Sequence, residues 1–276
     1  MKIQLIALDL DGTLVGRSMA IPERNRVALR AAMAQGCRVT IATGRSLVPT
    51  ARFARELELN APLILYQGAL IQDYRDGMVI HRQALPLSLA REIAAFAAAR
   101  QWATQIHAED GTAFTTRTNP LAARMSAITG VSATQVEDLM TQLDRPPLKF
   151  LFLETPEGAC ELIRELREHF GERINVVRSH DLIVEVTAPQ VSKGHALAIL
   201  AAHLGIPRAA TLAMGDHDND AEMLAWAGLG IAMPNASAMA RAAADMVAPP
   251  QSSSLDGHDE AVAWAVERFV LDTRAG

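Results

Sequence analysis

The sequence predicts an α/β protein with a three-layer core, in which a parallel sheet lies between helices, and a second α+β domain inserted into that core. Three observations support this fold class. Short apolar segments alternate with helical segments in the first 66 residues and again after residue 190. Each of the first three apolar segments ends in polar residues or glycine. Between the two halves, the pattern changes to paired strands joined by short turns, which is typical of an antiparallel sheet.

The N-terminal part accounts for the first half of the core. The first predicted strand, 3–8, is almost wholly apolar, as expected for a central parallel strand covered on both faces. Pro22 opens a helix that Gly36 ends, and a second buried strand follows at 37–42. After another helix, a third strand is predicted at 63–66. This β-α-β-α-β order implies right-handed parallel crossovers and hence a Rossmann-like core.

The middle of the chain predicts a different architecture. Asp110–Gly111 and Ser179–His180–Asp181 lie between apolar segments and predict two hairpins. We therefore expect a core domain formed by 1–81 and 190–276, and an inserted α+β domain at 82–189. A strand at 78–83 leads into the inserted domain, in which we expect strands at 103–107, 112–116, 148–153, 175–177 and 182–186, and helices at 86–100, 119–126, 133–143 and 158–170.

The core pattern returns after Pro189. Ser192 is a good N-cap for a helix that Gly205 ends. The expected strands of this part are 209–214, 229–233 and 246–248, and the expected helices are 193–204, 219–227, 236–243 and 259–271.

The composition excludes several classes of protein. The chain has 276 residues, half of them apolar, and a net charge of −5. It has no cluster of basic residues with interleaved aromatics, so we expect no nucleic-acid partner. Its two cysteines make neither a disulfide framework nor a zinc site. No apolar run is long enough to span a membrane, and Asp9 interrupts the N-terminal one, so we expect a cytoplasmic protein with no signal peptide.

Two of the predicted strands end in carboxylates. Asp9 and Asp11 follow the first strand, and Asp216 and Asp220 follow the strand at 209–214. Ligands of open α/β sheets bind beyond these carboxyl ends. Asp9 and Asp11 are two residues apart in extended chain and point to the same side. Close carboxylates are costly unless a cation relieves them, and Mg²⁺ takes oxygen ligands together with a substrate phosphate. The sequence therefore predicts a magnesium site at this edge.

Other residues at the same edge suit a phosphate. Thr43 and Gly44 offer a hydroxyl and an unhindered N–H beside a predicted helix N-terminus, and Lys193 offers a positive charge. Metal, phosphate cradle and lysine together indicate phosphoryl transfer. No Ser–His or Cys–His pair is evident, so the candidate nucleophile is a carboxylate. Asp9 would form an aspartyl-phosphate, and Asp11 would act as general acid and then base.

These stretches carry a resemblance to a known family. The insertion before Lys193 is similar to the C2B cap of the Cof-type subfamily IIB of the haloacid dehalogenase (HAD) superfamily. The stretches Gln67–Gly68–Ala69 and 230–236 also resemble that subfamily. Four stretches resemble motifs I to IV of that superfamily, in order: Asp9–Leu10–Asp11–Gly12–Thr13, Ala42–Thr43–Gly44–Arg45, Ser192–Lys193–Gly194 and Gly215–Asp216–His217–Asp218–Asn219–Asp220.

The resemblance implies a role for each matching residue. Asp9 would be the nucleophile and Asp11 the general acid/base, with Mg²⁺ held by the Asp9 side chain, the Asp11 main-chain carbonyl and Asp216. Asp220 would orient Lys193 or the metal shell. Gln67 stands where asparagine is commoner, which would change substrate contacts where cap and core meet. The implied phosphate contacts are the Leu10 N–H, Thr43, Gly44, Lys193 and Asn219.

The leading hypothesis is a Mg²⁺-dependent phosphatase for small phosphorylated metabolites, acting as a monomer or weak homodimer. A sugar phosphate is the first expectation, and pyridoxal phosphate or a flavin nucleotide are others. Two alternatives stay open: a phosphomutase that uses the same aspartyl-phosphate, and a non-enzymatic phospho-acceptor module. Candidate cap residues for reading the leaving group are Arg117, Arg124, Lys149, Arg178 and His180. Arg45 and Asp218 are expected to be surface charges only.

Overall fold

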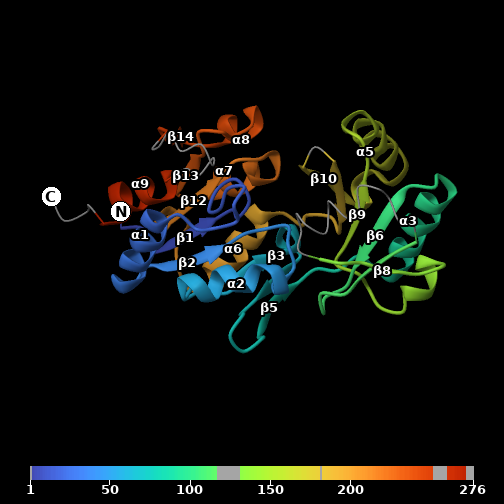
Figure 1. Cartoon of the computed structure of the whole chain (residues 1–276), viewed down its shortest axis with the longest axis horizontal. Helices are drawn as coiled ribbons and strands as arrows, with labels where there is room; N and C mark the ends of the chain where they lie inside the picture. The colour runs from blue at the N-terminus through green and yellow to red at the C-terminus, as the bar shows by residue number, and fades with distance from the viewer. Residues whose placement is uncertain (1, 117–130, 181, 251–259, 272–276) are drawn as a thin grey trace. The chain divides into compact units, whose positions relative to one another are not determined.

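The computed structural model describes residues 2–116, 131–180, 182–250 and 260–271 (Figure 1). The chain divides into two compact units. The first contains residues 1–44, 50–81 and 192–276, and the second contains residues 45–49 and 82–191. Each unit has its own sheets, and the two are described separately below.

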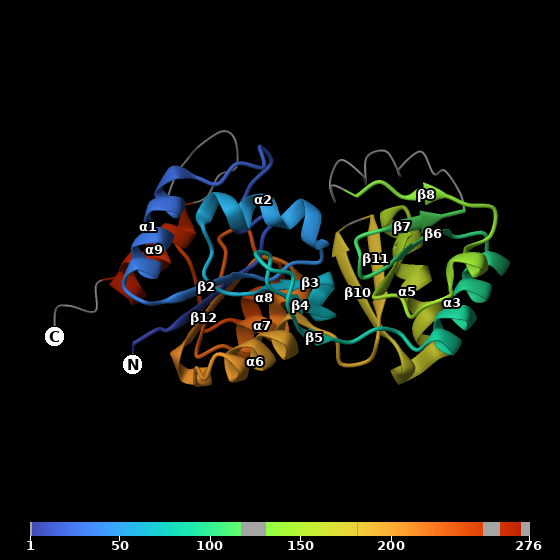
Figure 2. The same ribbon diagram turned by 90° about the horizontal axis from the view of Figure 1, so that it is seen from below.

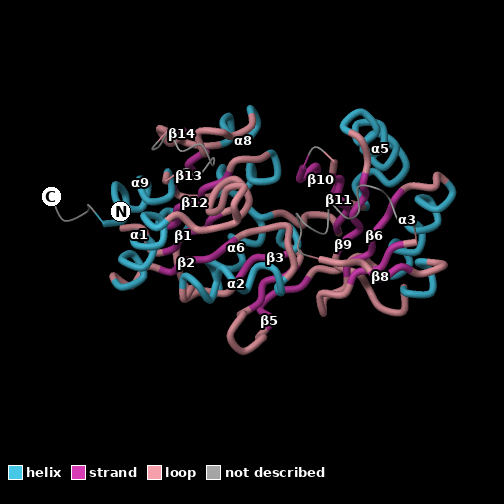
Figure 3. The backbone as a smooth tube through the Cα atoms, in the orientation of Figure 1, coloured by secondary structure: helices cyan, strands magenta, loops and turns pink. Residues whose placement is uncertain are grey.

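The first unit is built on a five-stranded parallel sheet with the order β14-β13-β12-β1-β2. β1 lies inside this sheet, and all four of its side chains are buried, as its apolar sequence predicts. Figure 3 shows these short strands alternating with helices along the chain. The strands are β1 Leu5–Leu8, β2 Arg38–Ile41, β12 Thr211–Gly215, β13 Leu229–Ala232 and β14 Met246–Val247.

Helices cover both faces of this sheet. In Figure 2, α1 and α9 lie on one face, and α6 and α7 lie on the other. The predicted class, a parallel sheet between two helical layers, is therefore confirmed. The helices of this unit, apart from short 3-10 turns, are α1 Glu23–Ala34, α2 Leu47–Leu57, α6 Lys193–His203, α7 Ala221–Trp226, α8 Ala238–Ala243 and α9 Ala261–Val266, which continues as a π-helical turn over Glu267–Leu271.

The third predicted strand is only partly what the sequence suggested. β3 (Leu63–Leu65) meets the parallel sheet through a single bridge between Ala42 and Ile64. Its main partner is β4 (Leu70–Gln72), antiparallel, within a separate sheet of order β3-β4-β5. The tight turn between β3 and β4 reverses the chain, so β3 pairs with its neighbour in sequence.

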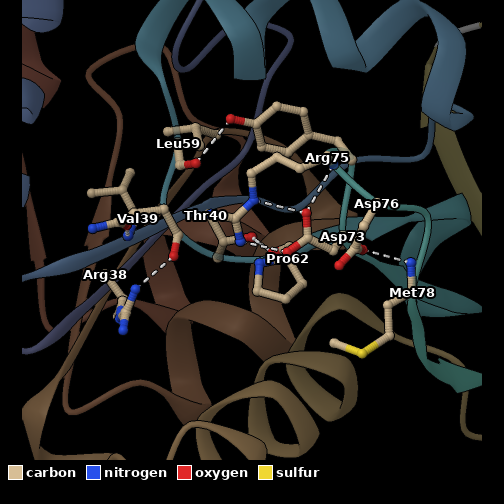
Figure 4. Close-up of polar contacts among 11 residues, drawn as sticks. Arg38, Val39, Thr40, Leu59, Pro62, Asp73, Arg75, Asp76 and Met78 are labelled. Atoms are coloured by element: carbon tan, nitrogen blue, oxygen red, sulfur yellow. Dashed lines mark hydrogen bonds and ion pairs between the residues drawn. The ribbon is translucent and has the colours of Figure 1, made fainter.

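Side-chain contacts fix this small sheet (Figure 4). The Thr40 hydroxyl of β2 donates to the carbonyl oxygen of Pro62 over 2.6 Å, just before β3. Past β4, the Asp73 carboxylate accepts from the main-chain N–H and the Nε of Arg75, both at 2.9 Å. These bonds close the turn that leads to β5 (Val79–Arg82).

The second unit contains a six-stranded sheet of order β10-β11-β9-β6-β7-β8, antiparallel except for β7 and β8. On one face, Phe152 contacts Trp102, which contacts Phe96 of α3, and Phe96 contacts Phe170 of α5. Both predicted hairpins are present. The elements are α3 Leu87–Ala99, β6 Ala103–His107, β7 Ala113–Thr115, β8 Thr134–Gln135, β9 Lys149–Leu153, α5 Pro156–Phe170, β10 Asn175–His180 and β11 Ile183–Thr187.

One predicted helix of this unit is wrong. Residues 133–143 form the short strand β8 and a 3-10 turn at Leu139–Gln142. β8 is the edge strand of the sheet and pairs with β7, and the Asp138 carboxylate accepts from the Met140 N–H over 2.8 Å. An aspartate in this position favours a turn over a helix interior. The helix predicted at 119–126 lies outside the described residues, as do Arg117 and Arg124.

Candidate active site

The sheet places the two acidic motifs side by side. β1 and β12 are neighbouring parallel strands, with Leu8 opposite Met214. The Asp9 N–H donates to the Met214 carbonyl over 2.9 Å, so the register continues to the end of the strands. Asp9 and Asp216 therefore leave the same edge of the sheet, which is the edge where ligands of such sheets bind.

Lys193 joins two of the carboxylates. Its Nζ lies 2.6 Å from Asp9 Oδ1 and 2.7 Å from Asp220 Oδ1, and the residue is only 1% exposed. The second carboxylate oxygen of Asp220 accepts from the main-chain N–H groups of Asp216 and His217, each at 3.0 Å. Asp220 is thus a fixed anchor that holds the lysine ammonium against Asp9.

Two residues to which the sequence analysis gave no role orient Asp216. The Thr13 hydroxyl donates to Asp216 Oδ1 over 3.4 Å, and the Asn235 amide donates to Oδ2 over 3.0 Å. Asn235 follows β13, which is the neighbour of β12 in the parallel sheet. The rule that points to Asp9 and Asp216, a polar residue after the carboxyl end of a strand, could therefore have identified Asn235 too.

Gly12 lets the loop after β1 approach Asp216. Its φ is +90°, and a Cβ added there would lie 2.3 Å from Asp216 Oδ2. Gly36 has a similar φ, +87°, but open space around it. We expect Gly12→Ala to lower the free energy of unfolding by about 2–4 kcal/mol and Gly36→Ala by only about 1–2 kcal/mol, because only the first adds a clash to the backbone strain. Chemical unfolding of both variants measures the difference, and equal losses would contradict it.

The charges of the site are not balanced. Burial raises the pKa of Asp9 well above the ordinary carboxyl value, which Lys193 opposes and Asp220 reinforces. Burial and the neighbouring Asp220 raise the pKa of Asp216 to about 7. Burial disfavours the charged form of Lys193, yet Asp220 and Asp9 raise its pKa above the usual value, so it stays protonated. The negative charge of Asp11 adds to both raised carboxyl pKa values.

This donor set fits a divalent cation. One oxygen from each of Asp9, Asp216 and Asp220 lies within 4.8 Å of the others. Oxygen ligands and surplus negative charge are what Mg²⁺ requires. Asp220 already accepts from Lys193 and from two N–H groups, so Asp9 and Asp216 are the better placed ligands. Asp11 is exposed and its carboxylate is not part of the cluster.

The residues predicted to bind phosphate lie around this cluster in the fold. Leu10 is buried, and its carbonyl accepts from the Val15 N–H over 2.9 Å, which closes the loop after Asp9. Thr43 and Gly44 follow β2, the other neighbour of β1. Thr43 is buried, and its N–H donates to the Ile64 carbonyl over 2.9 Å. The Thr43 carbonyl accepts from the Gln67 N–H over 3.0 Å, so both main-chain polar groups of Thr43 are bonded to β3 or the turn after it.

Asn219 is held by a residue in an unusual backbone conformation. Its Nδ2 donates to Gln67 Oε1 over 2.9 Å, and its buried Oδ1 has no hydrogen-bond partner among the described residues. Tyr66, Gln67 and Gly68 all have positive φ, at 51°, 60° and 103°. Strained backbone of this kind persists where the surroundings enforce it, and it is concentrated at functional sites. Gln67, which the resemblance implies would change substrate contacts, holds Asn219 through this bond.

Two expected surface charges are less exposed than predicted. Arg45 is only 8% exposed and precedes α2, which begins at Leu47. Asp218 is half-buried, and its Oδ1 accepts from the Ser237 hydroxyl over 2.6 Å at the start of α8. The contact of Asp218 with Ser237 joins segments distant in sequence, and the local pattern does not report such a contact.

Comparison with known proteins places this arrangement in a family. The family model described as haloacid dehalogenase-like hydrolase matches residues 6–257, which include every candidate residue above. The chain belongs to this family. The resemblance to the haloacid dehalogenase superfamily, inferred from the four motifs, is therefore confirmed. None of the helices in the described ranges has the length and hydropathy needed to cross a membrane.

Several curated relatives of this HAD hydrolase are named as phosphatases. It is 30% identical to the putative phosphatase YxeH of Bacillus subtilis, over 97% of its own length and 98% of the relative's. It is also 30% identical to the B. subtilis 5-amino-6-(5-phospho-D-ribitylamino)uracil phosphatase YcsE, over 98% and 96%. A chloroplast protein of Arabidopsis thaliana, endoribonuclease YBEY, is 30% identical over 98% of this chain, which spans only 47% of that longer protein. The names of the two full-length relatives confirm the predicted enzyme class, a HAD-type phosphatase.

Solved structures agree on the fold. A haloacid dehalogenase-like hydrolase from Bacteroides thetaiotaomicron superposes with a TM-score of 0.84 and 27% identity, over 97% of this chain and 99% of the other. The HAD subclass IIB sugar phosphatase BT4131 superposes with a TM-score of 0.82 at 23% identity, over 96% and 98%. The predicted core with an inserted domain is therefore the fold of this HAD hydrolase.

Proposed function

We propose that this HAD hydrolase is a Mg²⁺-dependent phosphatase of small phosphorylated metabolites that works through an aspartyl-phosphate on Asp9. The observation that carries the proposal is the buried contact of Asp9 with Lys193, beside Asp216 and at the carboxyl end of β1. This places a carboxylate, a fixed positive charge and a candidate cation site within a few ångströms. Phosphoryl transfer requires little beyond such positioning and charge stabilisation.

In the first step, a carboxylate oxygen of Asp9 attacks phosphorus and the bond to the leaving oxygen breaks. Asp11 donates a proton to that oxygen, so the leaving group departs as an alcohol. Lys193 favours the ionised form of Asp9 and stabilises charge on the phosphoryl oxygens. When bound by Asp9, Asp216 and the Asp11 carbonyl, Mg²⁺ would neutralise part of the phosphoryl charge. The phosphate contacts we propose are the Leu10 N–H, Thr43, Gly44, Lys193 and Asn219.

In the second step, water attacks the phosphorus of the aspartyl-phosphate and Asp11 takes its proton. The P–O bond to Asp9 breaks, which restores the carboxylate and releases inorganic phosphate. Asp11 suits both proton transfers because it is exposed and tied to the same short loop as Asp9. Asp220 contributes by anchoring Lys193, without touching the phosphoryl group.

We further propose that the second unit, which contains residues 82–191, is a substrate-specificity cap. None of the motif residues lies in its sheet, so the side chains of this sheet can differ between proteins that act on different substrates. The names of YcsE and BT4131 indicate that proteins of this fold act on a polyol-bearing phosphate and on sugar phosphates. A sugar or polyol phosphate is therefore the first substrate class to test, ahead of pyridoxal phosphate and flavin nucleotides.

The raised pKa of Asp216 predicts how Mg²⁺ should affect stability. Without a cation, a carboxyl with a folded pKa of about 7 and an ordinary value of 3.8 lowers stability as pH rises through that interval. Mg²⁺ must displace this proton, so its affinity should be about 30-fold weaker at pH 5.5 than at pH 8. We expect millimolar Mg²⁺ to raise the melting temperature clearly at pH 8 and little at pH 5.5.

The matched variant for this prediction is Asp216→Ala, which should lose most of the Mg²⁺-dependent rise at pH 8. Asp218→Asn, which removes a carboxylate of the same motif outside the cluster, should retain it. A rise that is equal at both pH values, or unchanged in Asp216→Ala, would contradict the assigned ligand.

The proposed activity is tested by phosphate release from a panel of sugar phosphates, polyol phosphates, pyridoxal phosphate, flavin mononucleotide and phenyl phosphate. Each assay is run with Mg²⁺ and with chelator. Release that requires Mg²⁺ supports the proposal, and the ranking gives the substrate class. A folded protein that releases phosphate from none of them would count against it.

A further inference from the structure

The turn between β3 and β4, residues Tyr66–Gly68, has a costly backbone conformation. Tyr66 and Gln67 have φ values of 51° and 60°, in the left-handed region that residues with a side chain rarely adopt. Both residues are almost fully buried, with exposed fractions of 1% and 2%. Contacts with other segments must therefore hold the turn in this conformation, and strain of this kind is typical of functional sites.

Two segments hold the main chain of this turn. The Gln67 N–H donates to the carbonyl oxygen of Thr43, just after β2, over 3.0 Å. Gly68 packs directly against the N-terminus of α6, since a Cβ added there would lie only 2.3 Å from the Ser192 carbonyl oxygen. Ser192 is the N-cap of α6 and precedes Lys193. The turn thus contacts the stretches that carry two of the proposed phosphate contacts, Thr43 and Lys193.

The Gln67 side chain reaches a third stretch, the acidic motif that follows β12. Its Oε1 accepts from Asn219 Nδ2 over 2.9 Å. The other end of that amide, Asn219 Oδ1, is buried and has no hydrogen-bond partner in the part of the chain that the structure describes. Among the described residues, Gln67 is therefore the side chain that orients the amide of Asn219.

The direction of this bond matters for an anionic ligand. A side-chain amide has an NH₂ group, which donates, and an oxygen, which accepts, and only the NH₂ group can bond to a phosphoryl oxygen. Gln67 Oε1 is an acceptor, so it favours Asn219 Nδ2 on its side, whereas a half-turn of the Asn219 amide would bring two oxygens together. The bond uses one N–H of Asn219 and leaves the second for another acceptor.

We propose that Gln67 is a positioning residue for phosphate binding, which acts by directing the NH₂ group of Asn219 toward the phosphoryl group. This rests on the phosphatase function proposed above, in which Asn219 contacts phosphate. Gln67 needs no contact with the substrate in this role. Because Thr43 and the N-terminus of α6 hold the turn, Asn219 is already oriented before the substrate binds. Such preorganisation raises affinity without a new contact.

The test removes the acceptor and measures phosphate affinity. Gln67→Leu keeps an apolar side chain but offers no oxygen to Asn219. With phenyl phosphate as substrate, we expect KM and the inhibition constant Ki of inorganic phosphate to rise about tenfold, the value of one hydrogen bond to a charged group, while kcat stays within about threefold. A purely structural role would lower the melting temperature without this split between affinity and kcat.

The matched control is Gln72→Leu in the same hairpin, whose amide donates to the Gly77 carbonyl. It should change KM and Ki by no more than about twofold. A double-mutant cycle then tests whether Gln67 acts through Asn219. Asn219→Ala should raise Ki at least as much as Gln67→Leu does, and the double variant should match Asn219→Ala, because the amide that Gln67 orients is then absent.

Thermal melting shows which variants fold, and Gln67→Ala replaces Gln67→Leu if that variant does not, with the same expected Ki. An unchanged Ki in the folded Gln67 variant, a loss of kcat at constant Ki, or additive losses in the double variant would overturn the inference. These results leave the phosphatase proposal intact, because wild type still hydrolyses phenyl phosphate. If wild type hydrolyses no phosphate monoester, the phosphatase proposal fails, and this inference fails with it.

Discussion

Replacing Asp9 by asparagine should reduce kcat by at least about 10³-fold, because an amide cannot form the aspartyl-phosphate. The fold should be retained. Asp9 is a buried carboxyl whose pKa is raised by its surroundings, so its ionised form is a cost to the folded state above the ordinary value of 3.8. An asparagine removes that cost while Lys193 keeps Asp220 as its partner. We expect the variant to melt at or above the wild-type temperature at pH 8.

The control for this prediction is Asp218→Asn. Asp218 belongs to the second acidic motif, and its carboxylate accepts a hydrogen bond from Ser237, the N-cap of α8. It should change kcat by no more than a few fold. Phosphate release and thermal melting of the two variants are measured together. An Asp9→Asn protein with substantial activity would remove Asp9 as the nucleophile.

Replacing Lys193 by methionine should have the largest effect on stability. Asp9 and Asp220 would lose the ammonium that lies within 2.7 Å of both. Removing one partner of a buried ion pair costs about 3–5 kcal/mol. Lys193 also lowers the pKa of Asp9, so without it Asp9 holds its proton to higher pH. The deficit should therefore grow as pH rises through the raised pKa of Asp9, and it should be larger at pH 8 than at pH 5.

Urea unfolding in the presence of chelator, at both pH values, measures this deficit. Lys2→Met, which removes an exposed lysine, should stay within about 0.5 kcal/mol of wild type. A deficit that is the same at pH 5 and pH 8 would show that the carboxylates do not depend on Lys193. Activity should fall too, because the ammonium is also a proposed phosphate ligand.

Much of the core could be predicted because its signals are local. The apolar strand before Asp9, the Pro22 and Gly36 boundaries of α1, and the cap at Ser192 depend on a few neighbouring residues each. The sheet order then follows from the parallel α/β pattern and brings the strand ends together. For this reason the amino-acid sequence alone is enough to place the acidic residues that follow β1 and β12 at one edge.

The failures have a common physical origin in contacts between distant segments. Residues 133–143 have the apolar spacing of a helix, but pairing with β7 and the turn at Asp138 outweigh that spacing. The positive φ of Gln67 and its bond to Asn219 depend on how the β3–β4 turn meets the 3-10 turn Asp218–Asp220. No periodicity in either segment reports such a contact.

The contacts of the candidate leaving-group residues in the second unit could not be predicted from the sequence either. Lys149 could be nominated from its charge alone, but its pairing with Glu185 requires the register of β9 and β11. Arg178 and His180, nominated beside it, make other contacts: Arg178 Nη1 lies 3.8 Å from Cys160 Sγ, and His180 Nδ1 accepts from the Leu182 N–H over 3.2 Å.

The most direct test of the account is to trap the phosphorylated enzyme. Asp11→Asn should slow hydrolysis of the aspartyl-phosphate more than its formation from phenyl phosphate, whose leaving group needs little protonation. Acid quenching followed by borohydride reduction converts an acyl phosphate on aspartate to homoserine, which mass spectrometry locates in the peptide. The account predicts homoserine at position 9, absent from Asp9→Asn. Turnover of phenyl phosphate by the Asp11→Asn enzyme with no modification at Asp9, or with modification at another aspartate, would contradict it.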